Sequence, residues 1–460
     1  MEVWRPLQTR PLTYFTFWLN YRLGGANPAG YHLANLLLHL GTVLLLARTL
    51  ARQLPERAVL AATALFALHP IQAEAVLYVF ARATVLATLL CLAAFDAWLR
   101  QRRWVAVGWF TLALAAKEEC AAFPLVLLLL HVVNRRDPGE RWPIAAMLAL
   151  SLVAGLRVFA ALSANPAAPA GARAGVSVLE YFMAQGPVIW RYLRLLVAPA
   201  GFTVDPAIEL PSSAAALAAW LALVGALAVT ARRLRASPWA FWILAGFLLL
   251  APSSSIFPAQ DLAADRRMYL PMTAFSAGVG LLAMRVDRRV IAGLACTLAV
   301  LSFNRSLVWM SEESLWSEAV RRSPGKLRPL IQLARAVPPQ QALELLAQAK
   351  RLAPEDASVA AELGRVWLAA GRPAEALAEF GRALALEPHS ARAMNNRGVA
   401  LLALGQTEAA RQDFERALRI DPCQADARLN LRGLGLEPPP AAGCRQSAGQ
   451  RAVTAQPPVR

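Results

Sequence analysis

Ten apolar runs separated by short polar turns are the feature that most constrains this chain. Several of these runs have about 15–20 residues with almost no charge, which suits a helix that crosses roughly 30 Å of hydrocarbon. Of the 460 residues, 57% are hydrophobic, above the share of about 45–50% that is usual in soluble domains. The sequence therefore predicts an all-α fold with a polytopic helical membrane domain. The runs lie at residues 31–48, 58–69, 83–99, 104–116, 120–134, 142–163, 213–230, 238–251, 271–284 and 290–303.

Arginine is concentrated in every second turn between these runs. Lysine and arginine number 47 against 30 acidic residues, and only three of the 47 are lysine. Cytoplasmic turns of membrane proteins collect basic residues, so the alternation predicts about ten crossings with both ends of this region on the outer side. Because topology accounts for these arginines, they need no nucleic-acid partner. The five clusters are Arg48, Arg52 and Arg57; Arg100, Arg102 and Arg103; Arg135, Arg136 and Arg141; Arg232, Arg233 and Arg235; and Arg285, Arg288 and Arg289.

A repeat of 34 residues follows the apolar region. Residues 355–388 and 389–422 match at Gly364 and Gly398, and at Phe380 and Phe414. This length and these small residues are typical of the tetratricopeptide (TPR) helix pair. A degenerate copy precedes them. Such a small number of repeats is expected to pack against the membrane region or against a partner.

The changes in composition divide the chain into five predicted parts. Residues 1–30 mix aromatic rings with arginine, which suits an outer interfacial segment at headgroup level. The tail is rich in proline and alanine and is predicted to be disordered. The parts are an interfacial segment at 1–30, a transmembrane domain at 31–303, an amphipathic connector with a degenerate TPR at 304–354, two TPR repeats at 355–422, and the tail at 423–460.

Function is expected in the turns on the arginine-poor side, and two of these turns carry charge next to apolar runs. Lys117, Glu118 and Glu119 lie in the first. They are either a hairpin tip in the headgroup layer or, for Lys117, a point charge for an anionic headgroup. In the second, Arg266 and Arg267 either belong to a helix start in which Asp265 offsets an arginine, or form a phosphate clamp. We expect Lys117, Arg266 and Arg267 to share one anion pocket.

A third turn, "LHPIQAEAVLYVFAR", holds further candidates. Pro70 removes a helical donor, so a helix break is expected beside His69. Glu74 is interpreted either as a general base or as the salt partner of Arg82. The five cysteines form no CxxC pair, so the sequence predicts neither a metal site nor a disulfide framework.

The motifs "RPLTYFTFWLN", "ALHPIQAEAVLYVFAR", "AAKEECAAFPL", "YLRLLVAP" and "DRRMYLP", followed by TPRs, resemble the bacterial relatives of the transmembrane-and-TPR O-mannosyltransferases of the GT-C superfamily. The resemblance implies a polyprenyl-phosphate sugar as donor and transfer to a protein or glycan hydroxyl on the periplasmic face, with inversion. It implies that Lys117 and the Arg266–Arg267 pair meet the lipid phosphate, and it matches His69, Glu74 and Arg82 to a motif in the second outer loop of the family. We predict a supporting set of His69, Arg82, Glu118 and Tyr269. It leaves the use of a divalent metal open.

One departure from the family pattern bears on activity. The family pattern begins with one more crossing and an outer loop that carries an acidic pair, whose carboxylate acts as general base. This sequence matches from the stretch after that loop, and Glu2 and Glu74 are the nearby substitutes. Two hypotheses follow: a glycosyltransferase of a bacterial inner membrane with periplasmic TPRs, and a catalytically inactive membrane scaffold whose TPR groove binds protein partners. A lipid-headgroup transporter is a weaker third, since no relay of paired carboxylates is visible within the apolar runs.

Overall fold

The computed structural model describes residues 10–134, 138–164, 176–208, 210–254 and 261–439. These residues form helices and connecting turns, with no strand among them. The contacts divide the chain into two units, one that ends at Trp309 and one that begins at Met310. Glu2, one of the predicted substitutes for the acidic base, lies outside the described residues. Each unit is described by itself.

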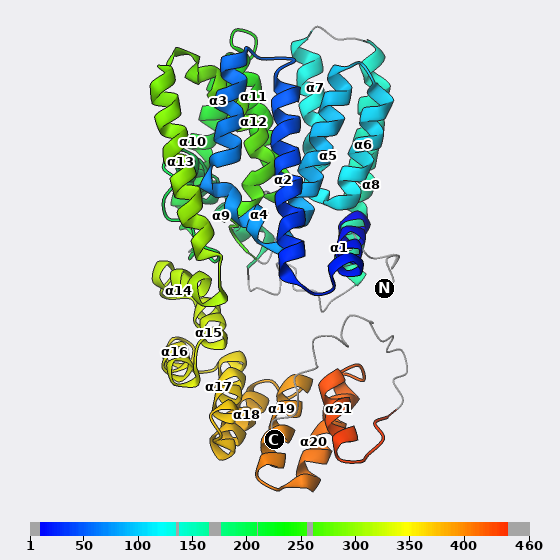
Figure 1. The fold of residues 1–460 in the computed structure, drawn as a ribbon, viewed down its shortest axis with the longest axis vertical. Helices are drawn as coiled ribbons and strands as arrows, with labels where there is room; N and C mark the ends of the chain where they lie inside the picture. The colour runs from blue at the N-terminus through cyan, green and yellow to red at the C-terminus, as the bar shows by residue number, and fades with distance from the viewer. Residues whose placement is uncertain (1–9, 135–137, 165–175, 209, 255–260, 440–460) are drawn as a thin grey trace. The chain divides into compact units, whose positions relative to one another are not determined.

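The first unit is a bundle of long helices joined by short turns (Figure 1). Its α-helices are α1 (Pro11–Gly24), α2 (Pro28–Leu50), α3 (Glu56–Leu68), α4 (Ala73–Leu77), α5 (Arg82–Leu99), α6 (Arg103–Ala116), α7 (Phe123–Val133), α8 (Arg141–Ala164), α9 (Val178–Val197), α10 (Ser213–Arg232), α11 (Pro238–Leu250), α12 (Tyr269–Leu282) and α13 (Arg288–Val308). Single 3₁₀ turns connect several of them: η1 (Pro70–Gln72), η2 (Val79–Ala81), η3 (Glu118–Ala122), η4 (Pro138–Glu140), η6 (Ala251–Ser253), η7 (Asp265–Met268) and η8 (Ala283–Arg285).

Five helical segments of the described residues are long and apolar enough to cross a membrane: Pro28–Leu50, Val79–Leu99, Arg141–Ala160, Ser213–Arg232 and Arg288–Val308. A sixth appears if α3 and the segment Pro70–Leu77 count as one broken span, bent by 47°. The predicted break at Pro70 is therefore confirmed. Helices α6 and α7 have 14 and 11 residues, about 21 and 17 Å at 1.5 Å per residue. Because such lengths are short for a crossing, the ten predicted crossings stay a prediction.

Small residues set the closest helix contacts within the bundle. A Cβ added to Gly280 on α12 would lie 2.5 Å from the Ala58 carbonyl oxygen of α3, and one added to Gly246 on α11 would lie 2.5 Å from the Phe275 ring of α12. Glycine therefore lets α12 approach both neighbours, as small residues do where membrane helices pack. This central helix carries Tyr269 at its first position, directly after η7.

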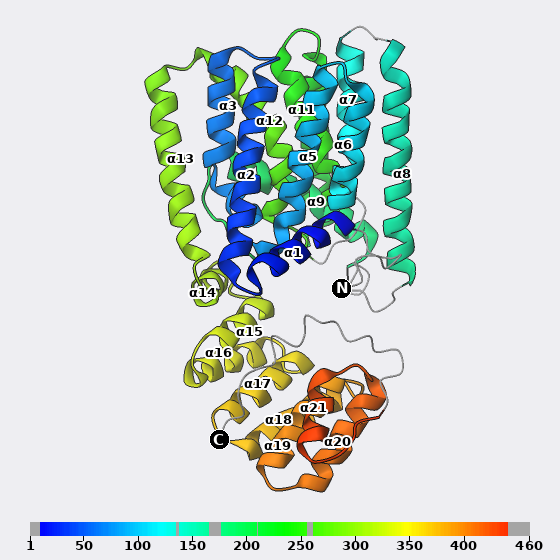
Figure 2. The same ribbon diagram turned by 45° about the vertical axis from the view of Figure 1, so that its right-hand side comes forward.

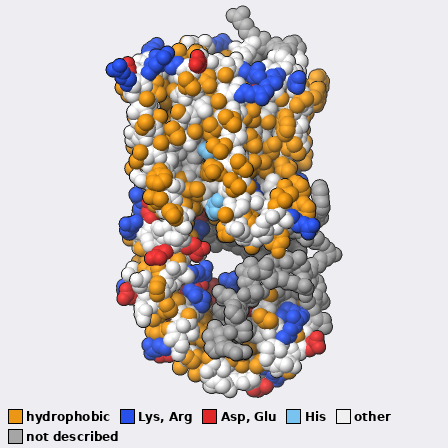
Figure 3. Space-filling model, viewed as in Figure 1, with side chains coloured by type: hydrophobic (Ala, Val, Ile, Leu, Met, Phe, Trp, Pro, Cys, Tyr) orange, Lys and Arg blue, Asp and Glu red, His pale blue; other side chains and the backbone are white. Residues whose placement is uncertain are grey.

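One end of the bundle, here called the arginine end, carries the turns between α2 and α3, α5 and α6, α10 and α11, and α12 and α13. At this end Asp96 accepts a hydrogen bond from Arg52 Nε at 2.9 Å and forms an ion pair with Arg100, whose Nε lies 2.8 Å from Oδ2. Arg57 of α3 donates to the carbonyl oxygen of Val286, which follows the neighbouring turn η8. Figure 3 shows basic side chains along this rim above a broad belt of hydrophobic ones. The arginine-rich turns, which alternate with arginine-poor turns along the sequence, therefore lie together at one end of the bundle.

The second unit repeats a helix pair. In the 34-residue repeats, α17 (Ala357–Ala369) pairs with α18 (Pro373–Leu386), and α19 (Ala391–Ala403) with α20 (Thr407–Ile420). Phe380 and Phe414 are fully buried against Gly364 and Gly398, so the matched positions are the contacts between paired helices. The other helices are α14 (Glu312–Arg322), α15 (Leu327–Ala336), α16 (Pro339–Leu352) and α21 (Ala425–Gly433).

The cysteines correct one expectation. Cys91, Cys120 and Cys296 are free, but Cys423, which directly follows the second repeat, is disulfide-bonded. The sequence predicted no disulfide framework and did not predict this single bond, because local spacing does not show which cysteines the fold brings together.

Replacing Gly398 by alanine tests the repeat packing. The new Cβ would lie 2.6 Å from the Phe414 ring, so we expect a loss of about 1–3 kcal/mol from overpacking. Gly381→Ala is the matched control, because its Cβ meets nothing within 4 Å and alanine favours a helix by about 1 kcal/mol. Limited proteolysis of the full chain in urea measures both. Equal protease resistance of the two variants would contradict the assigned packing.

Candidate functional site

The end of the bundle opposite the arginine end carries η1, α4, η3, η6 and η7, and is called the site end. Helix α1 lies across this end, crosswise to the long helices (Figure 2). Arg10, at its start, forms an ion pair with Glu118, and Thr13 Oγ1 donates to the Ala116 carbonyl oxygen at 2.9 Å. These bonds tie α1 to the turn after α6.

Glu74 and Arg266 form the central ion pair of the site end. Glu74 has a side-chain exposure of only 4%, and Arg266 contacts it through the guanidinium and through its backbone N–H, which donates to Glu74 Oε2 at 3.0 Å. Asp261 Oδ2 accepts from the same guanidinium at 3.0 Å. Burial alone would lower the pKa of Arg266, but these two carboxylates raise it above its ordinary value. The guanidinium that was predicted to hold a phosphate is therefore already neutralised.

Arg82 is not the salt partner of Glu74, so that interpretation was wrong. Its guanidinium is buried and donates to Asn35 Oδ1 at 2.8 Å and to the Tyr31 carbonyl oxygen at 3.0 Å. It also lies 4.4 Å from the centroid of the Phe17 ring. Because its partners lie on α1 and α2, Arg82 joins these two helices to the start of α5.

His69 and Tyr269 have structural partners. His69 Nδ1 accepts from the Ile71 N–H at 3.1 Å and so caps η1 after the break, while Nε2 lies 3.2 Å from the Leu196 carbonyl oxygen. Tyr269 is fully buried, and its hydroxyl lies 2.8 Å from His39 Nδ1. Both side chains support the loops rather than line an open site.

Lys117 is buried between two polar partners. Its Nζ donates to Thr84 Oγ1 at 2.7 Å and forms an ion pair with Glu119 Oε2 at 2.6 Å. Burial lowers the pKa of the ammonium below its ordinary value, although Glu119 acts in the opposite direction. Glu118 points elsewhere, since both of its carboxylate oxygens contact Arg10.

Arg267 differs from its neighbour because its hydrogen bonds go to neutral groups. Its guanidinium donates to Tyr181 Oη at 3.3 Å, to the Leu262 carbonyl oxygen at 3.1 Å and to the Asp261 carbonyl oxygen at 2.6 Å. Burial alone would lower its pKa, but electrostatic interactions with Tyr192, Tyr181 and Glu119 raise it. Glu119 therefore lies within electrostatic reach of both Lys117 and Arg267, which brings two of the three predicted phosphate ligands into one region.

Helix α9 supplies site residues that the sequence interpretation missed. Tyr192 Oη donates to the Ala264 carbonyl oxygen at 3.0 Å and accepts from the Ala264 N–H at 2.9 Å. Arg191 Nη1 forms an ion pair with Asp265 Oδ1 at 2.7 Å, so Asp265 does offset an arginine, but one from another helix. The available signal was Ser177 and Glu180, whose spacing forms a capping box at the start of α9.

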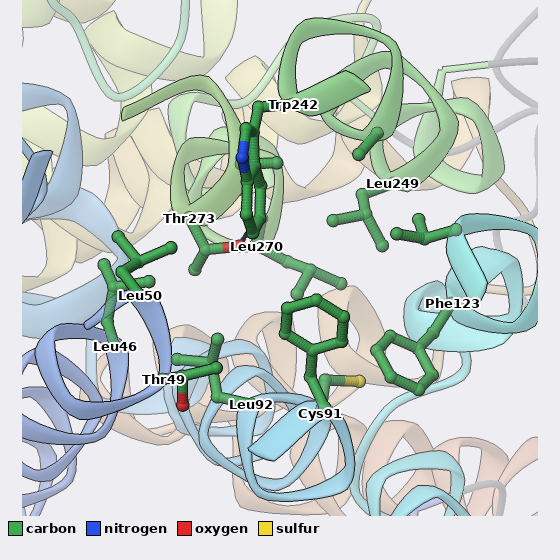
Figure 4. A pocket seen from close by; sticks show the side chains of 14 residues that line it. Leu46, Thr49, Leu50, Cys91, Leu92, Phe123, Trp242, Leu249, Leu270 and Thr273 are labelled. Atoms are coloured by element: carbon green, nitrogen blue, oxygen red, sulfur yellow. Dashed lines mark hydrogen bonds between the residues drawn. The ribbon is translucent and has the colours of Figure 1, made fainter. Parts of the chain in front are cut away.

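The cavity drawn in Figure 4 lies elsewhere, between α2, α5, α7, α11 and α12. Its volume is about 30 Å³, and its lining is apolar apart from Thr49, Thr273 and Cys91. Ligand pockets typically have about 300–1,000 Å³, so this space is a packing defect. Among the described residues, no group of three or more His, Cys, Asp or Glu side chains is placed to hold a metal ion.

A double-variant cycle tests the Glu74–Arg266 pair. Arg266→Gln leaves a buried carboxylate without its guanidinium, and we expect a loss of about 3 kcal/mol or more. Glu74→Gln should cost less, because Asp261 still neutralises Arg266. The combined variant should be at least about 1 kcal/mol more stable than the sum of the two losses predicts. Thermal unfolding in detergent measures all three, and strict additivity would contradict the pair.

The comparisons with known proteins concern the repeats and the relatives of the whole chain. Residues 368–425 match a tetratricopeptide repeat family model. Protein O-mannosyl-transferase F38B6.6 of Caenorhabditis elegans is 28% identical over 68% of this chain and 49% of its own length. Protein O-mannosyl-transferase Tmtc2 of Drosophila melanogaster is 40% identical over 28% of this chain and 16% of its own length. Protein O-mannosyl-transferase TMTC3 of Homo sapiens is 39% identical over 20% of this chain and 10% of its own length.

Among solved structures, the TPR protein YrrB is 22% identical over 31% of this chain and 77% of its own, with a TM-score of 0.25. The chain thus spans about half the length, or less, of the curated relatives that it matches. The repeats and the extended match to the worm protein support the same assignment. The chain is a relative of the TMTC-type, TPR-containing protein O-mannosyl-transferases.

Proposed function

We propose that this protein transfers a sugar from a polyprenyl-phosphate donor to a hydroxyl of a protein or glycan at the site end of the bundle. The observation that carries the proposal is Arg267, a buried guanidinium whose hydrogen bonds go to neutral oxygens. A guanidinium fork matches two phosphate oxygens, and burial strengthens that interaction. The names of the relatives supply the reaction class.

In this proposal only two of the three predicted basic residues bind the phosphate. Lys117 and Arg267 bind the phosphate, while Arg266 stays with Glu74 and Asp261 and holds the loop in place. An anion that competed for Arg266 would have to displace two carboxylates, one of them buried. An anion at Arg267 would replace only bonds to a hydroxyl and to carbonyl oxygens, which is the smaller loss.

The proposal includes a GT-C-like topology of about ten crossings in a bacterial inner membrane, with the site end and the TPRs on the periplasmic side. The arginine end then faces the cytoplasm, as the positive-inside rule expects. The TPRs would bind the acceptor protein or a partner.

An inactive scaffold is the second candidate. It is favoured by the acidic side chains of the site end, because Glu74, Glu118 and Asp265 are all held by arginines. In that case the repeats would recruit protein partners, and the bundle would serve as a membrane anchor. The two candidates differ in whether the site end binds a lipid phosphate.

Arg267→Gln tests the phosphate site. Loss of one charge-assisted interaction should weaken binding of farnesyl phosphate about 10- to 100-fold, measured by calorimetry in detergent. Arg100→Gln at the arginine end is the matched control and should bind as the unmodified protein does. If Arg267→Gln binds equally well, Arg267 does not hold the phosphate. Limited proteolysis of each variant shows whether the fold is retained.

Protease treatment of sealed vesicles tests the orientation. In right-side-out vesicles, added protease should remove the TPR unit, because the repeats lie on the outer side in this proposal. Inverted vesicles should protect it until detergent is added. Protection in right-side-out vesicles would place the repeats on the cytoplasmic side and overturn the topology.

A further inference from the structure

The acidic side chains of the site end differ in the basic group that they contact. Both oxygens of Glu74 contact Arg266, and both oxygens of Glu118 contact Arg10. Asp265 is buried against Arg191, and Asp261 is held by Arg266. Each of these four carboxylates is therefore occupied by a guanidinium, which an acceptor hydroxyl would have to displace.

Glu119 is different. Its side chain is 27% exposed, and its ion-pair partner among the described residues is Lys117, which lies 2.6 Å from Oε2. Its other oxygen, Oε1, accepts no hydrogen bond within the described part of the chain. The carboxylate thus combines access to solvent with a fixed position beside Lys117 and within electrostatic reach of Arg267.

We propose that Glu119 is the general base of the transfer, a role that rests on the function proposed above. Glu119 accepts the proton of the acceptor hydroxyl. The acceptor oxygen forms a bond to the anomeric carbon, the bond from that carbon to the phosphate oxygen breaks, and its electron pair leaves on the phosphate. Arg267 and Lys117 hold the additional negative charge, and Glu119 later returns its proton to water.

Because Glu119 is paired with Lys117, its availability as a base depends on whether the donor is bound. Before the donor binds, Lys117 has Glu119 as its counter-ion. A phosphate that enters beside Lys117 and Arg267 takes over the ammonium and repels the carboxylate. The carboxylate is then released from Lys117 and can contact the acceptor hydroxyl.

Glu119→Gln separates this role from a structural one, because donor binding and transfer should change in opposite directions. Removing a competing anion should make binding of farnesyl phosphate roughly fivefold tighter. Loss of the base should slow release of polyprenyl phosphate from polyprenyl-phosphate mannose at least about 100-fold. The full chain in detergent is used, with a mixture of serine- and threonine-containing peptides as acceptors.

Glu56→Gln is the matched control, since it also changes a glutamate to glutamine, but at an exposed position in the first turn of α3 at the arginine end, and its transfer should stay within about threefold of the unmodified chain. Normal transfer by Glu119→Gln would overturn the role of Glu119 and leave the proposed function standing. Loss of donor binding together with transfer would also overturn it, because that pattern marks a structural residue. An unmodified chain that binds farnesyl phosphate but transfers no mannose would overturn both proposals.

Discussion

The buried ion pair between Glu74 and Arg266 is the interaction on which the site end depends. It joins α4, which follows the break at Pro70, to the turn that begins the central helix α12. Breaking a buried pair by removing one partner is costly, because the remaining charge stays desolvated. The two loops are therefore held in one arrangement, and that arrangement fixes where Arg267 lies.

Neutralisation of charge then explains the different roles of neighbouring basic residues. Arg266 has two carboxylate partners, Lys117 has Glu119, and Arg267 has a hydroxyl and carbonyl oxygens. A site for an anion needs positive charge that is buried and incompletely neutralised. In our proposal Arg267 meets this condition best. Glu119 partly neutralises Lys117 and Arg267 until a phosphate binds.

Local and periodic features were predicted well from the sequence. The 34-residue period gave the paired helices and their contacts at Gly364 and Gly398, and the proline at position 70 gave the helix break. The site was predicted only in part. The sequence pointed to Glu74, Lys117, Arg266 and Arg267, but one of its two interpretations paired Glu74 with Arg82, and it missed α9. Both errors concern partners that are distant in the chain.

By itself, the sequence determined the helical class, the repeats and the difference between an arginine-rich end and an arginine-poor end, because hydropathy, period and charge act over a few residues. Only the tertiary structure decided which carboxylate meets which base. Glu74 and Arg266 are 192 residues apart in the chain. The hydroxyl of Tyr192 on α9 forms hydrogen bonds with the backbone of Ala264, just before η7. Such pairings depend on how the helices pack, so Arg266 and Arg267, adjacent in sequence, differ completely in their surroundings.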